Sequence, residues 1–233
     1  MQAFAKNNLT SIELPESLKN MGNIAFMDNK LASVKIPKNL INIPTGAFSK
    51  NQITSVLIPD GVTTIGRAAF MDNSLETIII PSTVESIGGT AFSSNKLKAV
   101  TIPSSVKNIG KDAFAKNENL KLTYSKLVEA IEYGEKIKTD DKSEEKIKLL
   151  KEAIEAGNNL DKKPNATLDE VNKAIEEIDN AIETLVGIEN FEFSDGRITK
   201  YIGTETNITI PRTIKEEKVT TIGNGAFANK KLT

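Results

Sequence analysis

The chain has 233 residues, a formal net charge of −1, and neither cysteine nor histidine. Disulfides, thiol nucleophiles, the Ser-His-Asp triad and the usual zinc ligand sets are thereby excluded. Without a cluster of Lys or Arg, and with few aromatic residues, the sequence argues against nucleic acid as a partner. No phosphate-binding loop or EF-hand spacing occurs, so we expect no catalytic residue, cofactor or metal.

An Ala-Phe pair returns every 22 residues along the first half of the chain. Its phenylalanines are Phe4, Phe26, Phe48, Phe70, Phe92 and Phe114, and the pair occurs once more at Phe227. Proline and asparagine keep the same step, at Pro15, Pro37, Pro59, Pro81 and Pro103 and at Asn7, Asn29, Asn51, Asn73, Asn95 and Asn117. A fixed period of this length predicts a solenoid in which each repeat is one coil.

Within each coil the pattern predicts a short strand followed by two corners. Val56 and Ile58 keep the period of two that is typical of a strand, and Pro59 closes that strand because proline cannot donate to a ladder. Gly66 is expected to permit the second corner. The phenylalanines should form a buried spine, and the asparagines an internal ladder that satisfies backbone groups at a bend; exposed turn asparagines are the alternative.

These units resemble the BspA-like leucine-rich repeats of bacterial surface proteins, over residues 1 to about 123 and again from about 188 to 233. One unit shows all the columns: Leu75, Ile78, Ile80, Pro81, Val84, Ile87, Gly88, Ala91, Phe92 and Asn95. Departures are small, such as Pro44 in place of a glycine. The resemblance implies a non-enzymatic, cell-surface or secreted protein that adheres to a host or matrix protein or glycan.

The strand alternation also predicts which residues face outward. Candidate partner-binding positions on this face are Lys35, Ser55, Leu57, Thr77, Ile79 and Thr101. Leu57 and Ile79 are two adjacent apolar residues on a solvated face, and such a patch can anchor a protein or sugar. The alternative is that these branched side chains stabilise neighbouring strands.

Residues 124–187 lose the period and contain 10 lysines against 16 acidic residues. Apolar spacing predicts three helices there, around Leu127 and Ile131, around Ile147 to Ile154, and from Val171 to Leu185. Thr167 to Glu170 forms a capping box, Asp141 to Glu144 a weaker one, Gly157 is expected to end the second helix, and Pro164 marks a turn. At this size the bundle is expected to lean on its neighbours.

The same segment, residues 124–187, resembles the FIVAR modules, small three-helix units that lie between other domains of bacterial surface proteins. The residues that carry this likeness are Thr167, Glu170, Val171, Ala174, Ile178, Ala181, Ile182 and Leu185. A generic spacer bundle explains them equally well, and either reading makes this segment a spacer.

A hairpin is predicted after the bundle, because Phe191 to Phe193 and Ile198 to Ile202 flank an Asp-Gly turn. It is expected to cap the second array, which the repeat pattern resumes up to Phe227. The predicted fold is α+β, a leucine-rich repeat β-solenoid of 22-residue units interrupted by a small three-helix bundle. Its parts are residues 1–123 as an array, 124–187 as the bundle, and 188–233 as the hairpin cap and an incomplete second array.

Both ends of the chain interrupt a repeat, so we expect a fragment, and no stretch reads as a signal peptide or membrane span. Uncapped repeat ends favour end-to-end self-association, which light scattering at high concentration would test.

Two alternatives to adhesion stay open. The array can be a structural stalk that presents other domains. A glycan-acting enzyme fragment is the remote alternative, and it depends on Asp140-Asp141 or Glu144-Glu145 as an acid and base pair. A solvated helix face explains these carboxylates better, because adjacent side chains on a helix point apart.

Overall fold

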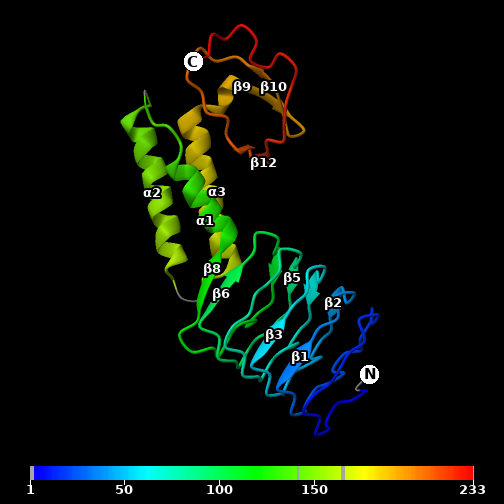
Figure 1. The fold of residues 1–233 in the computed structure, drawn as a ribbon. Helices are drawn as coiled ribbons and strands as arrows, with labels where there is room; N and C mark the ends of the chain where they lie inside the picture. Colours follow the sequence, from blue (N-terminus) through cyan, green and yellow to red (C-terminus); the bar gives the residue numbers. More distant parts are fainter. Residues whose placement is uncertain (1–2, 141, 164–165, 233) are drawn as a thin grey trace. The chain divides into compact units, whose positions relative to one another are not determined.

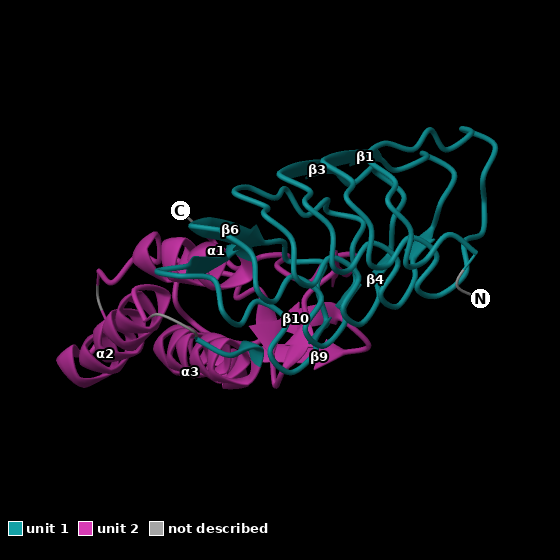
Figure 2. Cartoon of the chain, turned by 90° about the horizontal axis from the view of Figure 1, so that it is seen from below, with its two compact units in different colours: residues 1–125, 164–168 teal, residues 126–163, 169–233 magenta. Residues whose placement is uncertain are grey.

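The computed structural model describes residues 3–140, 142–163 and 166–232. It divides into two compact units, residues 1–125 with 164–168 and residues 126–163 with 169–233 (Figure 2). The division does not fall at residue 187, since the helical segment and the C-terminal strands belong to one unit. The predicted three-part domain organisation therefore stays a prediction.

The first unit is a stack of repeats joined by two series of short parallel strands (Figure 1). One series contains β1 (Ser33–Lys35) beside β3 (Ser55–Leu57), and β6 (Ala99–Ile102) beside β8 (Lys121–Tyr124). The other contains β2 (Asn42–Ile43), β4 (Thr64–Ile65), β5 (Ser86–Ile87) and β7 (Asn108–Ile109) in one sheet. Partners lie 22 residues apart, as in Val34 with Val56 and Ile65 with Ile87.

The fourth repeat departs from the predicted strand pattern. Ile78 and Ile80 are buried, and Thr77 and Ile79 are exposed, as the alternation requires. Residues 77–80 nevertheless form no strand, so β3 and β6 belong to separate sheets. Burial of the inward side chains is therefore enough to keep the alternation without continuous backbone pairing.

The phenylalanine spine is confirmed. From Phe4 to Phe114 successive rings stack with centroids 5.2–5.6 Å apart and interplanar angles of 2–13°. Phe48, Phe70 and Phe92 are fully buried, whereas Phe4 at the start of the stack is 48% exposed. Each ring is covered by the rings of the coils before and after it, so a single coil cannot bury its own ring.

The asparagine ladder is also confirmed. The Asn73 Nδ2 group donates to the carbonyl oxygens of Phe48 (2.9 Å), Phe70 (3.2 Å) and Met71 (3.3 Å), and its Oδ1 accepts from the Ile53 N–H (3.0 Å). Asn51, Asn95 and Asn117 repeat this arrangement. Each amide satisfies backbone groups of its own coil and of the coil before it, which water does not reach.

The glycine column has a different cause from the one predicted. Gly66 lies outside the left-handed region, and a Cβ placed on it would meet the backbone of the preceding coil, 2.6 Å from Thr45 N and 2.7 Å from Pro44 C. Close approach of the coils therefore selects glycine, and freedom at a corner does not. Left-handed backbone occurs two residues later instead, at Ala68 (φ 53°) and Thr90 (φ 54°).

The described residues form three helices, α1 (Ser125–Glu135), α2 (Glu144–Asp161) and α3 (Leu168–Val186). They lie in the second unit except for the first residues of α1 and α3, which belong to the first unit. Ser143 caps α2, accepting from the Lys146 N–H at 3.4 Å. The weaker capping box predicted at Asp141 and the turn at Pro164 lie outside the described residues.

The predicted role of Gly157 is wrong, because α2 continues past it to Asp161. Gly157 is buried inside the helix, and a Cβ there would lie 3.1 Å from Ile178 Cδ1 and 3.2 Å from Ile131 Cγ1. Glycine at this position thus lets α2 pack closely against α1 and α3. The apolar pattern around it was read correctly, but the glycine serves packing.

The Asp-Gly hairpin is confirmed. After the short η1 (Ile188–Asn190), β9 (Phe191–Ser194) pairs antiparallel with β10 (Arg197–Tyr201) around Asp195 (φ 50°) and Gly196 (φ 71°). β13 (Thr221–Ile222) then pairs parallel with β10. Between β10 and β13, β11 (Thr213–Ile214) and β12 (Glu217–Lys218) form a second hairpin.

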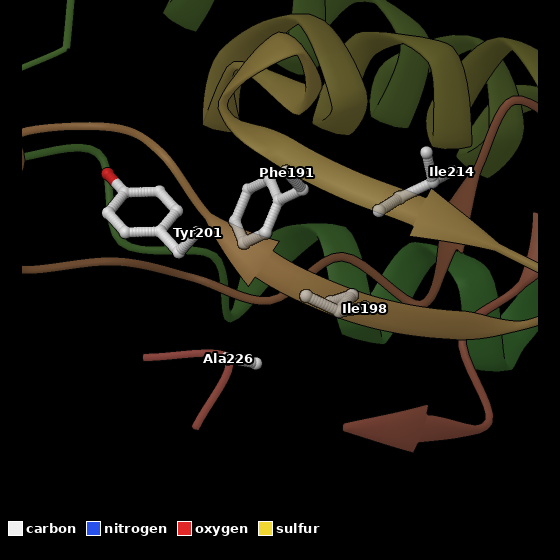
Figure 3. Close-up of a cluster of buried hydrophobic side chains, with 5 residues drawn as sticks. All are labelled: Phe191, Ile198, Tyr201, Ile214 and Ala226. Atoms are coloured by element: carbon white, nitrogen blue, oxygen red, sulfur yellow. The ribbon is translucent and has the colours of Figure 1, made fainter. Parts of the chain in front are cut away.

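The first hairpin takes the place of a preceding coil for the second array. The Tyr201 ring stacks on Phe227 at 5.9 Å, and Ile198 accepts from the Gly223 N–H as Ile65 does from Gly88. Figure 3 shows Tyr201, Phe191 and Ile198 gathered in the buried cluster that also contains Ile214 and Ala226. Tyr201 thus supplies the ring that a preceding repeat would otherwise provide.

Side chains of α1 and α3 contact residues 210–215 of the second array. Arg212 binds Asp179 on α3 through Nε (2.6 Å) and Nη2 (3.0 Å), and its guanidinium lies 5.5 Å from the Tyr133 ring centroid. The Tyr133 hydroxyl donates to the Ile210 carbonyl at 3.1 Å, and Glu183, which is buried, accepts from the Lys215 N–H at 3.2 Å. The helical segment leans on the C-terminal strands, as its size predicted.

Replacing Arg212 with methionine is expected to destabilise the chain by about 2 kcal/mol, because Asp179 is left partly buried without its charged partner. The matched control is Lys173→Met on the same helix, whose exposed pair with Glu177 has its atoms 3.7 Å apart. That control should cost less than about 0.5 kcal/mol. Urea denaturation measures both, and equal losses would contradict the expectation.

Burial raises the pKa of Tyr133, against a smaller lowering effect of Arg212. Burial disfavours the charged phenolate, so the folded chain keeps the phenol neutral to higher pH than the unfolded chain does. The contribution of the neutral phenol to the free energy of unfolding is complete below the unfolded pKa of about 10, and it is lost as the pH rises through the folded pKa. We therefore expect the free energy of unfolding to fall more steeply above about pH 10 in the wild type than in Tyr133→Phe. Parallel pH profiles, measured by urea denaturation, would show that the phenol is not responsible.

Candidate binding surface

Five of the six predicted partner-binding residues lie together. Residues 33–35, 55–57 and 77–79, which we call the binding face, line a shallow depression of about 450 Å³ in the first unit. Lys35, Ser55, Leu57, Thr77 and Ile79 are among them. Thr101 is not part of this lining and lies on β6 opposite Thr123 of β8.

The binding face carries two apolar side chains that are open to solvent. Leu57 is 71% exposed and Ile79 is 76% exposed, although each sits in a repeat whose inward residues are buried. Large exposed apolar side chains are unremarkable when scattered, but two in adjacent coils make a continuous patch. The 22-residue register places them side by side, and the flanking positions Ser55 and Thr77 leave them uncovered.

The predicted lysine of the binding face is already neutralised. Lys35 Nζ lies 2.5 Å from Glu16 Oε1, and both side chains are largely exposed. The hydrogen bond with Lys35 is the main cause that lowers the pKa of the Glu16 carboxyl, and the same bond raises the pKa of Lys35. An exposed pair of this kind contributes little stability, and Lys35 offers a partner less net charge than the sequence suggested.

A second depression, of about 490 Å³, was missed at the level of sequence. We call it the lysine depression; it is lined by Lys96, Lys98 and Lys116 together with Glu76, Asn95 and Glu118. No lysine cluster is visible in the linear sequence, because Lys96 and Lys116 are nearly one repeat apart. Aligning the repeats on their 22-residue period would have shown that these lysines lie close together.

Glu144 and Glu145 are exposed in the first turn of α2, Asp140 is exposed, and Asp141 lies outside the described residues. Across residues 3–140, 142–163 and 166–232, no group of three or more acidic side chains is placed to hold a metal ion. Nor does any helix in that part of the chain have the length and apolar character needed to cross a membrane.

Comparison with known families gives the same answer as the repeat geometry. The BspA type leucine-rich repeat region matches residues 1–121 in six copies. The chain therefore belongs to the BspA-type leucine-rich repeat family. Proteins with these repeats are typically protein-binding surface or secreted proteins, and the repeat is generally a non-enzymatic interaction module.

One similar solved structure is the crystal structure of a leucine-rich repeat protein from Bacteroides ovatus ATCC 8483, at 34% sequence identity. The match covers 45% of this chain and 28% of that chain, with a TM-score of 0.37. No curated protein matches the chain. The likeness of residues 124–187 to FIVAR modules stays a prediction.

Proposed function

We propose that the chain is part of a bacterial cell-surface protein that adheres to a host or matrix partner through the binding face of its repeat solenoid. The observation that carries the proposal is the exposed apolar pair Leu57 and Ile79 in the lining of the depression. Family membership supports protein binding in general, and the pair supplies a specific place for it. The repeat core is buried, and it supports the binding face.

Apolar burial sets the size of the effect. Fully burying a side chain such as Leu or Ile contributes about 1.5–3 kcal/mol relative to leaving it exposed. Two of them near the centre of an interface are the kind of residues that dominate alanine scans when a pocket receives them. In a shallow depression the two side chains are only partly buried on binding, so the pair contributes roughly 2–4 kcal/mol to the binding free energy.

Changing Leu57 and Ile79 together to serine is therefore expected to weaken binding by at least about 30-fold, since 1.4 kcal/mol corresponds to a factor of ten. The measurement is a screen of immobilised matrix proteins and glycans, followed by affinity determination for each positive. The matched control is Ile41→Ser, since Ile41 is 56% exposed but lies outside the binding face.

Two results would sink the adhesion proposal. One is a native chain that binds nothing in the screen while a longer form of the protein also binds nothing. The other is a loss of affinity in Ile41→Ser as large as in the double variant, because that would show a general response to lost surface apolarity.

A structural stalk is the second candidate, and the unbroken ring stack from Phe4 to Phe114 favours it. Six stacked coils linked by rings and amides make a stiff rod, with a coil spacing of about 4.8 Å. This candidate is supported if the longer protein adheres while the present chain binds nothing. It is excluded if the present chain alone binds through Leu57 and Ile79.

A further inference from the structure

The three ammonium groups of the lysine depression form no ion pair with the two carboxylates that share its lining. Among the residues that the structure describes, Lys96, Lys98 and Lys116 form no ion pair, and Lys98 Nζ donates only to the backbone carbonyl of Glu118, at 3.2 Å. Two other exposed lysines of the same unit do form ion pairs, Lys35 with Glu16 and Lys107 with Glu85. The depression thus places three ammonium groups beside the two carboxylates of Glu76 and Glu118, an excess of one positive charge.

The lysine depression continues the binding face along the chain. Glu76, on its rim, directly precedes Thr77 of the binding face, and Lys98 directly precedes β6 in the next coil. Coils are about 4.8 Å apart and an extended chain rises about 3.3 Å per residue, so about five residues of a bound segment span three coils. One segment can contact both the apolar pair and the lysines.

We infer that the partner contacts this unit through a protein segment that carries an apolar side chain next to two or more carboxylates. The inference rests on the proposed function and names the chemistry of its partner. The apolar side chain packs on Leu57 and Ile79, and the carboxylates meet the ammonium groups of Lys96, Lys98 and Lys116. An apolar centre with a charged rim is the usual anatomy of a protein interface.

An anionic glycan fits the same lysines less well. Neither depression is lined by an aromatic ring on which a sugar could stack, and a sulfated sugar would leave Leu57 and Ile79 uncovered. Rim charges chiefly raise the association rate and make binding sensitive to salt. A peptide with both features therefore contacts the apolar pair and the lysines, whereas an anionic sugar contacts the lysines alone.

The test is selection of a phage-displayed random peptide library on the full chain, with counter-selection on Leu57→Ser/Ile79→Ser. Enriched peptides are expected to contain Leu, Ile or Phe beside Asp or Glu. The synthetic form of the most enriched peptide should bind Lys96→Gln/Lys98→Gln/Lys116→Gln at least about tenfold more weakly than wild type. Lys107→Gln is the matched control and should bind normally.

Salt separates the charge contribution from packing. Raising NaCl from about 0.05 M to about 0.5 M should weaken peptide binding to the wild type and leave the triple lysine variant nearly unchanged. Circular dichroism confirms that each variant is folded, which is expected because all six substituted side chains are exposed.

The outcomes distinguish this inference from the proposed function. Peptides that require Leu57 and Ile79 but lack carboxylates and ignore the lysine substitutions overturn the inference alone. Enriched peptides that ignore Leu57→Ser/Ile79→Ser, or no enrichment at all, count against both. Lysine-dependent retention on heparin without enrichment of acidic peptides would show that the surface takes an anionic glycan, and the inference would be wrong.

Discussion

Replacing Gly66 with alanine is expected to destabilise the chain by about 3 kcal/mol or more. The added Cβ would lie 2.6 Å from Thr45 N, 2.7 Å from Pro44 C and 2.8 Å from Ile43 O, all of them backbone atoms of the preceding coil. No rotamer change relieves such contacts, so two coils must move apart. That movement also loosens the ring stack and the parallel pairing of β2 with β4.

Chemical denaturation of the full chain measures this loss, and Gly89→Ala is the matched control. Gly89 is also followed closely by the next coil, but its Cβ would lie 3.1 Å from Lys111 O, a contact that a small shift relieves. The control should cost less than about 1.5 kcal/mol. If both substitutions had the same effect, close coil approach would not be the reason for the glycine column.

Asn73→Ala is the second substitution with a large expected effect, about 3–5 kcal/mol. It removes the partner of the Ile53 N–H and the donor to the Phe48 and Phe70 carbonyls, all in the buried interior. A buried backbone group without a partner costs about 1–3 kcal/mol. The loss falls on two coils at once, so we expect one cooperative transition at lower denaturant concentration.

Asn7→Ala is the control for position in the column. Asn7 donates to the Phe4 and Ala5 carbonyls, but both hydrogen bonds are exposed and water can replace them. Its loss should be below about 1 kcal/mol. Asn73→Ser gives a further check, since a hydroxyl is too short to reach both coils. A loss for Asn7→Ala that equals that of Asn73→Ala would contradict the ladder as the source of stability.

Periodic features were predictable because every copy sits in nearly the same surroundings. Phe70 and Asn73 repeat in several coils, so residue type, spacing and burial reinforce one another. The hairpin at Asp195 and Gly196 was predictable for a different reason, since few residues tolerate the positive φ values of that turn. The outward direction of Leu57 and Ile79 followed from alternation alone.

Features that depend on how closely neighbouring coils or helices approach each other were not predictable. The pattern showed that Gly66 matters but suggested a corner, because sequence does not reveal how closely two coils approach. Gly157 was misread in the same way. The Arg212 contact with Asp179 and Tyr133 joins residues with no shared period, so only the folded unit brings them together. The lysine depression required the exact offset between neighbouring coils.

The asparagine ladder runs in one direction, and this matters while the protein is being made. Each asparagine forms hydrogen bonds with backbone groups of the coil before it. The Ile53 N–H donates to Asn73, which lies 20 residues later, and the Phe48 carbonyl accepts from the same amide, 25 residues later. A ribosome therefore releases every coil with open donors and acceptors, which close only after most of the next repeat has emerged. A coil that has left the ribosome stays without these hydrogen bonds until the asparagine of the next repeat has also left it.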